Sequence, residues 1–140
     1  MNTIQYRACT TADIDRVREF WNSALHGGST NTREAIRVFL DLHPDLFILA
    51  WDDGLLVGTV IGGWDGWRAN FARLAVHYDY RRRGIARELV ERAERLLISK
   101  GARRVYVNIL ADSPEGFDFW RSVGFTPNVV IEAYAKNIGP

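Results

Sequence analysis

Residues 74–90 bring together an apolar run, a turn rich in arginine with one glycine, and the start of a helix. The run is Leu74–Val76, the turn holds three arginines before Gly84, and the helical pattern that follows includes Arg87. A strand that enters a helix through a glycine leaves the first N–H groups of the helix without helical partners, at the positive end of the helix dipole. Such N–H groups, with arginines beside them, favour phosphate. This stretch therefore predicts a diphosphate site.

Hydrophobic periodicity predicts helices and strands along the whole chain. Helices are expected at about 12–25, 32–42, 85–100 and 114–124, and strands at 4–9, 46–51, 55–62, 67–76 and 105–110, with Phe125 and 129–135 supplying the last strands. Turns at Asp52-Asp53-Gly54 and Trp64-Asp65-Gly66 would join three of these strands into an antiparallel meander. The strand before the arginine turn, the helix after it and the strand at 105–110 form a βαβ unit, so their two strands should be parallel.

Length, charge and cysteine content narrow the class of protein. With 140 residues, 47% of them hydrophobic, residues 1–140 fit one compact domain. The net charge of +1 gives no general attraction to nucleic acid or to an anionic membrane, so the expected partner is small. Cys9 is the only cysteine, and the three histidines have no metal-ligand spacing, so no metal is expected. Without a membrane-length apolar run or a secretory signal, we expect a cytoplasmic protein.

Two sequence blocks resemble one known family. The spacing Arg81-x-x-Gly84-x-Ala86 after Leu-Ala-Val is similar to the acetyl-coenzyme A signature of the GNAT N-acetyltransferase superfamily, and residues 119–125, Phe-Trp-Arg-Ser-Val-Gly-Phe, resemble its second block. The details look most like small bacterial members. The resemblance implies an α/β (α+β) fold: a mixed, mostly antiparallel sheet of six to seven strands with about four helices, splayed between the fourth and fifth strands.

The same resemblance implies acetyl-coenzyme A (acetyl-CoA) as cosubstrate. In the family, backbone groups freed by the splay bind the pantetheine arm, and a bulge in the fourth strand presents an N–H to the thioester carbonyl. By resemblance Leu74 and Val76 occupy these positions, and the backbone of Val76 would stabilise the oxyanion. The residues implied in cofactor binding are Leu74, Ala75, Val76, Arg81, Arg82, Arg83, Gly84, Ile85, Ala86, Arg87, Asn108, Ser113, Phe119 and Trp120.

Two positions depart from the family pattern for proton transfer. Asn70 stands where several relatives that acetylate proteins carry a glutamate base, and an amide cannot accept a proton at neutral pH. Trp120 stands where many relatives have the tyrosine that protonates the departing thiolate, and an indole cannot release its proton at useful pH. Trp120 is equally well explained as a core aromatic residue at a helix end. Water, or Tyr78 or Tyr106 for the acid, would then do this work.

The acceptor side is the least specified part of the sequence. By resemblance, residues 22–36, which include His26 and Asn31, lie over the acceptor. Asp65 beside Trp67 is explained by an Asp-Gly turn, and the alternative is that the pair holds a cationic amine by ion-pair and cation–π contacts. The implied acceptor is a primary amine on a small molecule or a protein. Pairing of two copies through the C-terminal strands, common in relatives, makes a homodimer an expectation to test.

Three classes of function follow from these residues. The first is an N-acetyltransferase that moves an acetyl group from acetyl-CoA to an amine by direct attack. The second is a CoA or acyl-CoA binding module without turnover, suggested by the lack of proton-transfer chemistry at Asn70 and Trp120. The third is an adaptor for nucleic acid or protein that uses the arginine turn as a basic patch, against which the low net charge argues.

Overall fold

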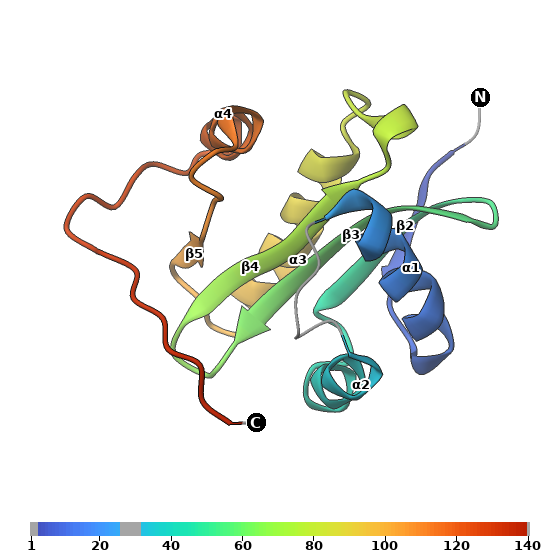
Figure 1. The fold of residues 1–140 in the computed structure, drawn as a ribbon, viewed down its shortest axis with the longest axis horizontal. Coiled ribbons are helices and arrows are strands. Elements are labelled where there is room, and N and C mark those ends of the chain that lie inside the picture. The colour runs from blue at the N-terminus through green and yellow to red at the C-terminus, as the bar shows by residue number, and fades with distance from the viewer. Residues whose placement is uncertain (1–2, 26–31, 140) are drawn as a thin grey trace. The chain divides into compact units, whose positions relative to one another are not determined.

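The structure is a computed structural model that describes residues 3–25 and 32–139 (Figure 1). They divide into two compact units, residues 1–108 and residues 109–140, which are described in turn. The elements of the first unit are β1 (Gln5–Ala8), the 3-10 turn η1 (Thr11–Asp13), α1 (Ile14–Ala24), α2 (Arg33–Leu42), β2 (Phe47–Asp52), β3 (Leu55–Trp64), β4 (Ala69–Val76), the 3-10 turn η2 (Tyr78–Tyr80), α3 (Ile85–Ser99) and β5 (Val105–Val107).

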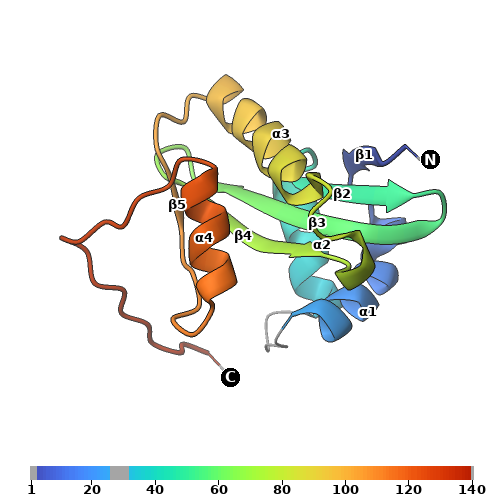
Figure 2. The same cartoon turned by 90° about the horizontal axis from the view of Figure 1, so that it is seen from above.

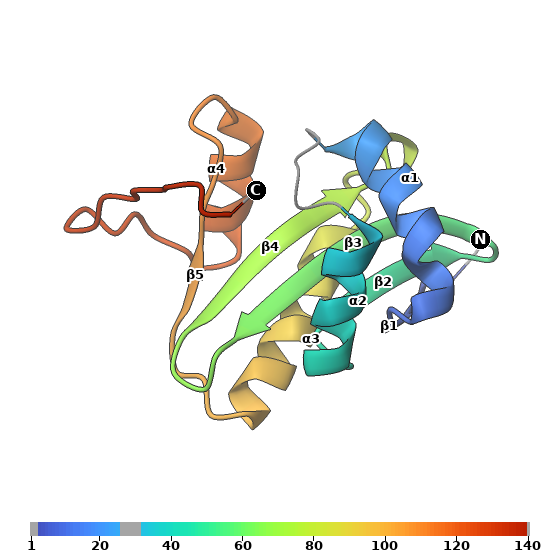
Figure 3. The same ribbon diagram turned by 60° about the horizontal axis from the view of Figure 1, so that its bottom comes forward.

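One mixed sheet organises the first unit, with strand order β1-β2-β3-β4-β5. The first four strands are antiparallel neighbours, and β4 pairs with β5 in parallel. Figures 2 and 3 show α3 on one face of this sheet and α1 with α2 on the other. The predicted meander and the parallel βαβ pair are therefore confirmed.

Both faces of the sheet are covered by apolar helix faces. On α1, Ile14, Val17 and Trp21 are buried, and Trp21 stacks on Phe47 of β2 with ring centroids 5.5 Å apart. On the opposite face, a Cβ added at Gly58 of β3 would lie 3.0 Å from Leu89 and 3.1 Å from Ile85 of α3. Glycine at position 58 therefore lets the first turn of α3 pack closely on β3.

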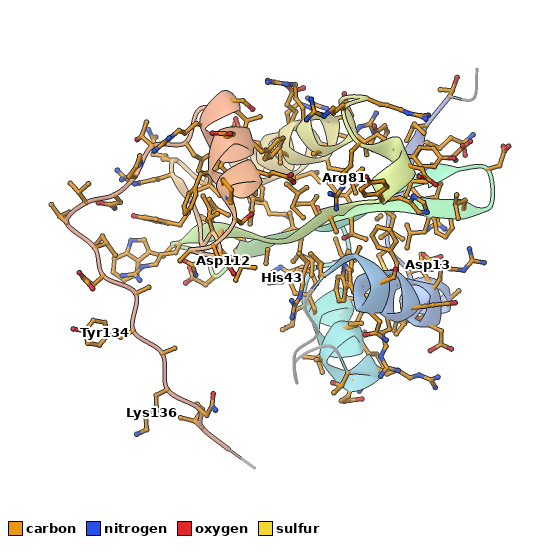
Figure 4. All side chains as sticks on the ribbon, turned by 45° about the horizontal axis from the view of Figure 1, so that its top comes forward. Asp13, His43, Arg81, Asp112, Tyr134 and Lys136 are labelled. Carbon is orange, nitrogen blue, oxygen red and sulfur yellow. The ribbon has the colours of Figure 1, made fainter. Side chains whose placement is uncertain are left out.

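A buried carboxylate ties β1 to the start of α1. Asp13, labelled in Figure 4, accepts two hydrogen bonds from the Arg7 guanidinium, at 2.7 and 2.9 Å, and one from the Thr10 N–H at 2.9 Å. The hydrogen bond from Arg7 is the main reason why the pKa of Asp13 falls to about 2. A carboxyl whose pKa is lowered by folding stabilises the protein only while it is ionised.

We expect this carboxylate to make stability depend on acid pH. The free energy of unfolding of wild type should exceed that of Asp13→Asn, and this difference should shrink by on the order of 1 kcal/mol as pH is lowered from about 4 to about 2. The effect is small because Arg7 is half exposed, so that solvent screens the pair. Urea denaturation of both proteins at pH 6, 4 and 2.5 measures the difference. Asp15→Asn, in an exposed pair with Arg33, is the control and should stay within about 0.5 kcal/mol of wild type at pH 6. A wild-type advantage that stays constant down to pH 2.5 would contradict the assignment.

The second unit contains α4 (Pro114–Ser122). Its start follows the predicted rules, because the Ser113 hydroxyl accepts the Gly116 N–H at 3.1 Å and Pro114 occupies the first turn. Its end packs around Trp120, whose ring lies 5.2 Å from that of Phe119 and 5.0 Å from that of Phe125. The predicted helix at 114–124 is confirmed to within its last two residues.

The prediction of further strands at Phe125 and 129–135 is wrong. No strand follows α4 within the described residues, so the sheet has five strands rather than six to seven. Val129 and Tyr134 are 90% and 91% exposed, and Figure 4 shows Tyr134 and Lys136 projecting from an extended chain. β-branched and aromatic residues favour a strand only where a partner strand pairs with them, which local sequence cannot supply. β5 stops at Val107, so the predicted strand at 105–110 is too long.

Within the described residues, no helix combines the length and the apolarity that a membrane crossing requires. The same part of the chain contains no group of three or more His, Cys, Asp or Glu side chains that could hold a metal ion.

Candidate functional site

The N-terminus of α3 is open and rich in backbone donors. Gly84 is its N-cap residue, with φ +82°, and in the described part of the chain no heavy atom beyond its neighbours in sequence lies within 4 Å of a Cβ added there. The first helical hydrogen bond runs from the Glu88 N–H to the Gly84 carbonyl at 3.0 Å. The N–H groups of Ile85 and Ala86, which precede this bond, therefore have no acceptor inside the helix. An anion placed before this turn meets N–H groups and the positive end of the helix dipole.

The arginine turn before α3 is held by its own aromatic neighbours. The Arg83 guanidinium donates to the Asp79 carbonyl at 3.1 Å and lies 4.7 Å from the centre of the Tyr80 ring. The Tyr80 hydroxyl donates to a carboxylate oxygen of Asp52, and this bond raises the pKa of the tyrosine. Arg81–Gly84 are all exposed. Asp52 and Tyr80 were missed by the sequence analysis, because they lie 28 positions apart and belong to no motif.

Arg81, labelled in Figure 4, links the turn to the end of β4. Its Nε donates to the Val76 carbonyl at 3.5 Å, and its guanidinium lies 5.4 Å from the centre of the Tyr78 ring. The cation is therefore placed between the edge of β4 and the start of α3, where an anionic group would gain a charged donor.

A bulge interrupts β4 three residues before its end. Ala72 pairs with Ile61 and Ala75 pairs with Thr59, so that Arg73 and Leu74 together face the single residue between them on β3. Arg73 takes a positive φ of 54°. An extra residue of this kind shifts every later residue of the strand by one position. This is the bulge that the family resemblance implied for the fourth strand.

The shift turns the backbone of Val76 away from β3. Before the bulge the Asp65 N–H donates to the Arg68 carbonyl. In this part of β4 the even-numbered residues are therefore the ones whose backbone N–H and C=O bond to β3. After the bulge the His77 N–H donates to the Val57 carbonyl at 2.8 Å, so the odd-numbered residues are now the partners. The N–H and C=O of Val76 therefore point to the other edge of β4.

Among the described residues, no strand pairs with that other edge beside Val76. The parallel pairing of β4 with β5 covers Ala69 to Phe71 and ends at Val107, whereas β4 continues to Val76. β4 therefore runs beyond its pairing with β5, as a splay between the fourth and fifth strands would require, and the splay itself stays a prediction. A free backbone edge of this kind can bind an extended ligand by the same hydrogen bonds that bind a strand.

Comparison with known proteins identifies the family at this point. A family model described as the acetyltransferase (GNAT) family matches residues 14–125. The chain belongs to the GNAT acetyltransferase family. The match includes the arginine turn, the N-terminus of α3 and the bulged strand.

Individual proteins similar to this chain support the same family. The chain is 42% identical over 74 residues to an acetyltransferase of Pectobacterium atrosepticum, a match that covers 53% of this chain and 52% of that protein. The chain thus spans about half the length of the curated relatives it matches. Among solved structures, Ard1 from Thermoplasma volcanium has a TM-score of 0.79 at 22% identity, covering 88% of this chain and 82% of that one. YncA, described as a putative acetyltransferase of Salmonella typhimurium with its cofactor acetyl-CoA, has a TM-score of 0.73 at 18% identity, covering 89% and 80%. These two share the GNAT fold with this chain.

The residues considered for proton transfer lie on β4, on β5 and in η2. Asn70 is exposed on β4 and pairs with Gly63 on one side and with Tyr106 of β5 on the other. Asn108 is exposed just after β5. Tyr78 is exposed in η2, beside Arg81. The structure therefore brings Asn70 and Tyr106 together on neighbouring strands, but their roles in catalysis stay predictions.

Three residues predicted to contact the cofactor lie in the second unit. Ser113 caps α4, Trp120 is buried, and Phe119 is half-buried against it. The interpretation of Trp120 as a core aromatic residue at a helix end therefore explains its placement. Contact of Ser113, Phe119 and Trp120 with the cofactor stays a prediction.

The structure describes some of the residues predicted to contact the acceptor and not others. Asp65 accepts the N–H groups of Trp67 and Arg68 at 2.7 and 2.5 Å, and these bonds, that from Arg68 foremost, lower its pKa. The turn therefore accounts for Asp65, while Trp67 is 84% exposed beside the Arg68 guanidinium. Their contact with an amine stays a prediction. His26 and Asn31, and with them the middle of the predicted acceptor segment 22–36, lie outside the described residues.

Cys9 is not suited to act as a nucleophile. It is buried beside Asp13, and burial is the main reason why the pKa of its thiol rises to about 12. Because only the thiolate is a good nucleophile, Cys9 is a core residue at neutral pH.

Proposed function

We propose that this protein is an N-acetyltransferase that moves an acetyl group from acetyl-CoA to a primary amine by direct attack of the amine. The observation that carries the proposal is the adjacency of two backbone features: the open N-terminus of α3 at Gly84, and the free edge of β4 at Val76, with Arg81 linking them. Residues from both compact units fall within the family match, which supports a single acetyltransferase domain over residues 1–140.

The residues present fit coenzyme A. A diphosphate needs several donors and a close approach, and the first turn of α3 offers the N–H groups of Ile85 and Ala86 behind a glycine with open space in front of it. The pantetheine arm carries amide groups in an extended chain, which suit the backbone edge of β4 beyond Phe71. The acetyl-CoA named with the related fold of YncA supports the same choice of cosubstrate.

Bound acetyl-CoA supplies an activated acetyl group to a neutral amine. The chain's own part is to hold and polarise the thioester: we propose that the Val76 N–H donates to its carbonyl oxygen, with the backbone of Leu74 beside it on the same edge. An amine with a pKa near ~10 is mostly protonated at pH 7 and must lose a proton before it attacks. Asn70 cannot take that proton, so we propose that water does.

A second function has a specific observation in its favour. The side chain at the base position is an amide, and Trp120 at the acid position is buried among aromatic rings. Both features suit a CoA or acyl-CoA binding module without turnover.

Calorimetry and a thiol-release assay separate the two functions. Acetyl-CoA is titrated into the protein, and release of free thiol is then followed with a panel of amines that includes amino acids, polyamines, aminoglycosides and peptides with a free N-terminus. Binding together with thiol release from at least one acceptor is expected. Binding without release from any acceptor would support the binding module, and no heat and no thermal shift would reject both functions.

A further inference from the structure

A buried chain of hydrogen bonds joins α1, β3 and β4 at the bulge. The indole Nε1 of Trp21 donates to the Thr59 hydroxyl at 2.9 Å, and this hydroxyl donates to the Arg73 carbonyl at 2.8 Å. Trp21 is 1% exposed and Thr59 is fully buried. An indole N–H can only donate and a carbonyl can only accept, so the direction of both bonds follows from the groups themselves.

The Arg73 carbonyl reaches Thr59 because the bulge turns it. In a regular strand the C=O groups lie in the plane of the sheet and point at neighbouring strands. The Thr59 side chain instead stands on the face of the sheet that α1 covers, where it meets Trp21. The carbonyl that accepts from this hydroxyl is therefore tilted toward the face that α1 covers, and Arg73 has a positive φ at this point of the bulge.

The conformation needs this support. A non-glycine residue at positive φ is strained, and it persists where its surroundings over-determine it. The buried hydroxyl of Thr59 in turn needs an acceptor, because an unpaired buried donor is costly. The Arg73 guanidinium also lies 5.4 Å from the centre of the Trp21 ring. Two contacts from elements distant in sequence, one from β3 and one from α1, therefore meet at one residue of the bulge.

We infer that Thr59 and Trp21 are positioning residues for acyl transfer: they hold the bulge and thereby keep the Val76 N–H on the free edge of β4. Without the extra residue, the register before the bulge would continue and pair Val76 with Val57, which would turn the Val76 N–H into the ladder with β3. The structural part of this inference stands on the geometry alone. Its catalytic consequence rests on the proposed function.

Hydrogen exchange in the free protein tests the structural part. Thr59→Val keeps the shape of the side chain and removes the hydroxyl, and Thr59→Ser keeps the hydroxyl. The quantity measured is the ratio of the amide exchange rate of His77, which lies after the bulge, to that of Asn70, which lies before it. In Thr59→Val this ratio should rise about tenfold, because the bulge opens locally. Thr59→Ser should stay within about twofold of wild type. Val90→Ala, a buried change in α3, is the control for general loss of stability, and it should leave the His77 to Asn70 ratio unchanged.

Kinetics and binding test the catalytic part. Thr59→Val should lower kcat for the best acceptor by about tenfold, because the Val76 N–H is displaced from the thioester oxygen but not removed. The Kd for CoA should stay within about twofold of wild type. Thr59→Ser should restore kcat, which a general loss of packing would not predict. If Thr59→Val does not fold, Trp21→Phe takes its place, since phenylalanine can still stack on Phe47 but has no indole donor.

The outcomes separate this inference from the proposed function. An unchanged exchange ratio and an unchanged kcat in both Thr59→Val and Trp21→Phe would overturn the positioning role. A wild-type protein that binds no CoA would overturn the proposed function, and the exchange ratio would still decide what holds the bulge.

Discussion

Gly84→Val is expected to lower the affinity for acetyl-CoA by at least about 100-fold while the protein stays folded. Several charge-assisted hydrogen bonds to a diphosphate are worth about 1.5–3 kcal/mol each, and about 2.8 kcal/mol corresponds to that factor. The new side chain would enter the open space before α3, where, apart from its own chain neighbours and the helix backbone, no atom of the described residues lies within 4 Å of its Cβ. The side chain would therefore fill the space in which the diphosphate is proposed to bind, and it would not enter the core. Calorimetric titration with acetyl-CoA and with CoA measures the loss.

A matched glycine separates binding from backbone strain. Gly101 ends α3 at φ +106°, and it too has no heavy atom within 4 Å of an added Cβ. Gly101→Val therefore introduces a comparable strain at the far end of the same helix, and its Kd for acetyl-CoA should remain within about twofold of wild type. Equal loss of affinity in both variants would mean that strain in α3, and not blockage of its N-terminus, explains the effect.

Much of the site was predictable because its parts are contiguous in sequence. A glycine that begins a helix, arginines in the preceding turn and an apolar strand before it depend on neighbours within a few positions, and the structure has all three between Leu74 and Ile85. The same holds for the Asp65 turn and for the Ser113 cap. Local hydrogen bonds and dihedral preferences decide such features, so they can be found in a single sequence.

The rest depends on contacts that cross the chain. Trp21 lies 38 positions from Thr59, and Thr59 lies 14 positions from Arg73, so no window of sequence shows that a hydroxyl holds the bulge. The strands expected at 129–135 failed for a related reason. Their residues have the composition of a strand, but a strand exists only with its partner, and propensity carries no information about which backbone is available to pair.

The bulge also explains how one apolar strand can serve both the core and a ligand. Phe71 and Ala75 are both buried, although they lie four positions apart on opposite faces of the sheet: Phe71 pairs with Gly62, which faces α3, and Ala75 pairs with Thr59, which faces α1. An alternating strand would put both on one face. The extra residue between them changes the phase, so the strand can continue to fill the core while the backbone of Val76 is released from the ladder.

Val76→Pro is expected to lower kcat for acetyl transfer by about 100-fold and to leave the sheet intact. Proline removes one backbone N–H, and loss of a single oxyanion donor in other acyl transferases costs about 10²–10³ in rate. The fold should tolerate the change because the Val76 N–H lies on the free edge, where proline is accepted in strands. Val76→Ala, which shortens the side chain but retains the N–H, is the matched variant and should keep kcat within about threefold of wild type.

The neighbouring position provides the contrast that makes this test specific. Ala75 pairs with Thr59 in the ladder after the bulge and is buried against the core, so Ala75→Pro removes a hydrogen bond that the sheet uses and should unfold the protein at room temperature. Circular dichroism and thermal unfolding distinguish the two prolines. If Val76→Pro folds and turns over as fast as Val76→Ala, the oxyanion donor is not at Val76. If Val76→Pro unfolds as Ala75→Pro does, the backbone of Val76 belongs to the ladder, and the change of phase argued from the His77 hydrogen bond is wrong.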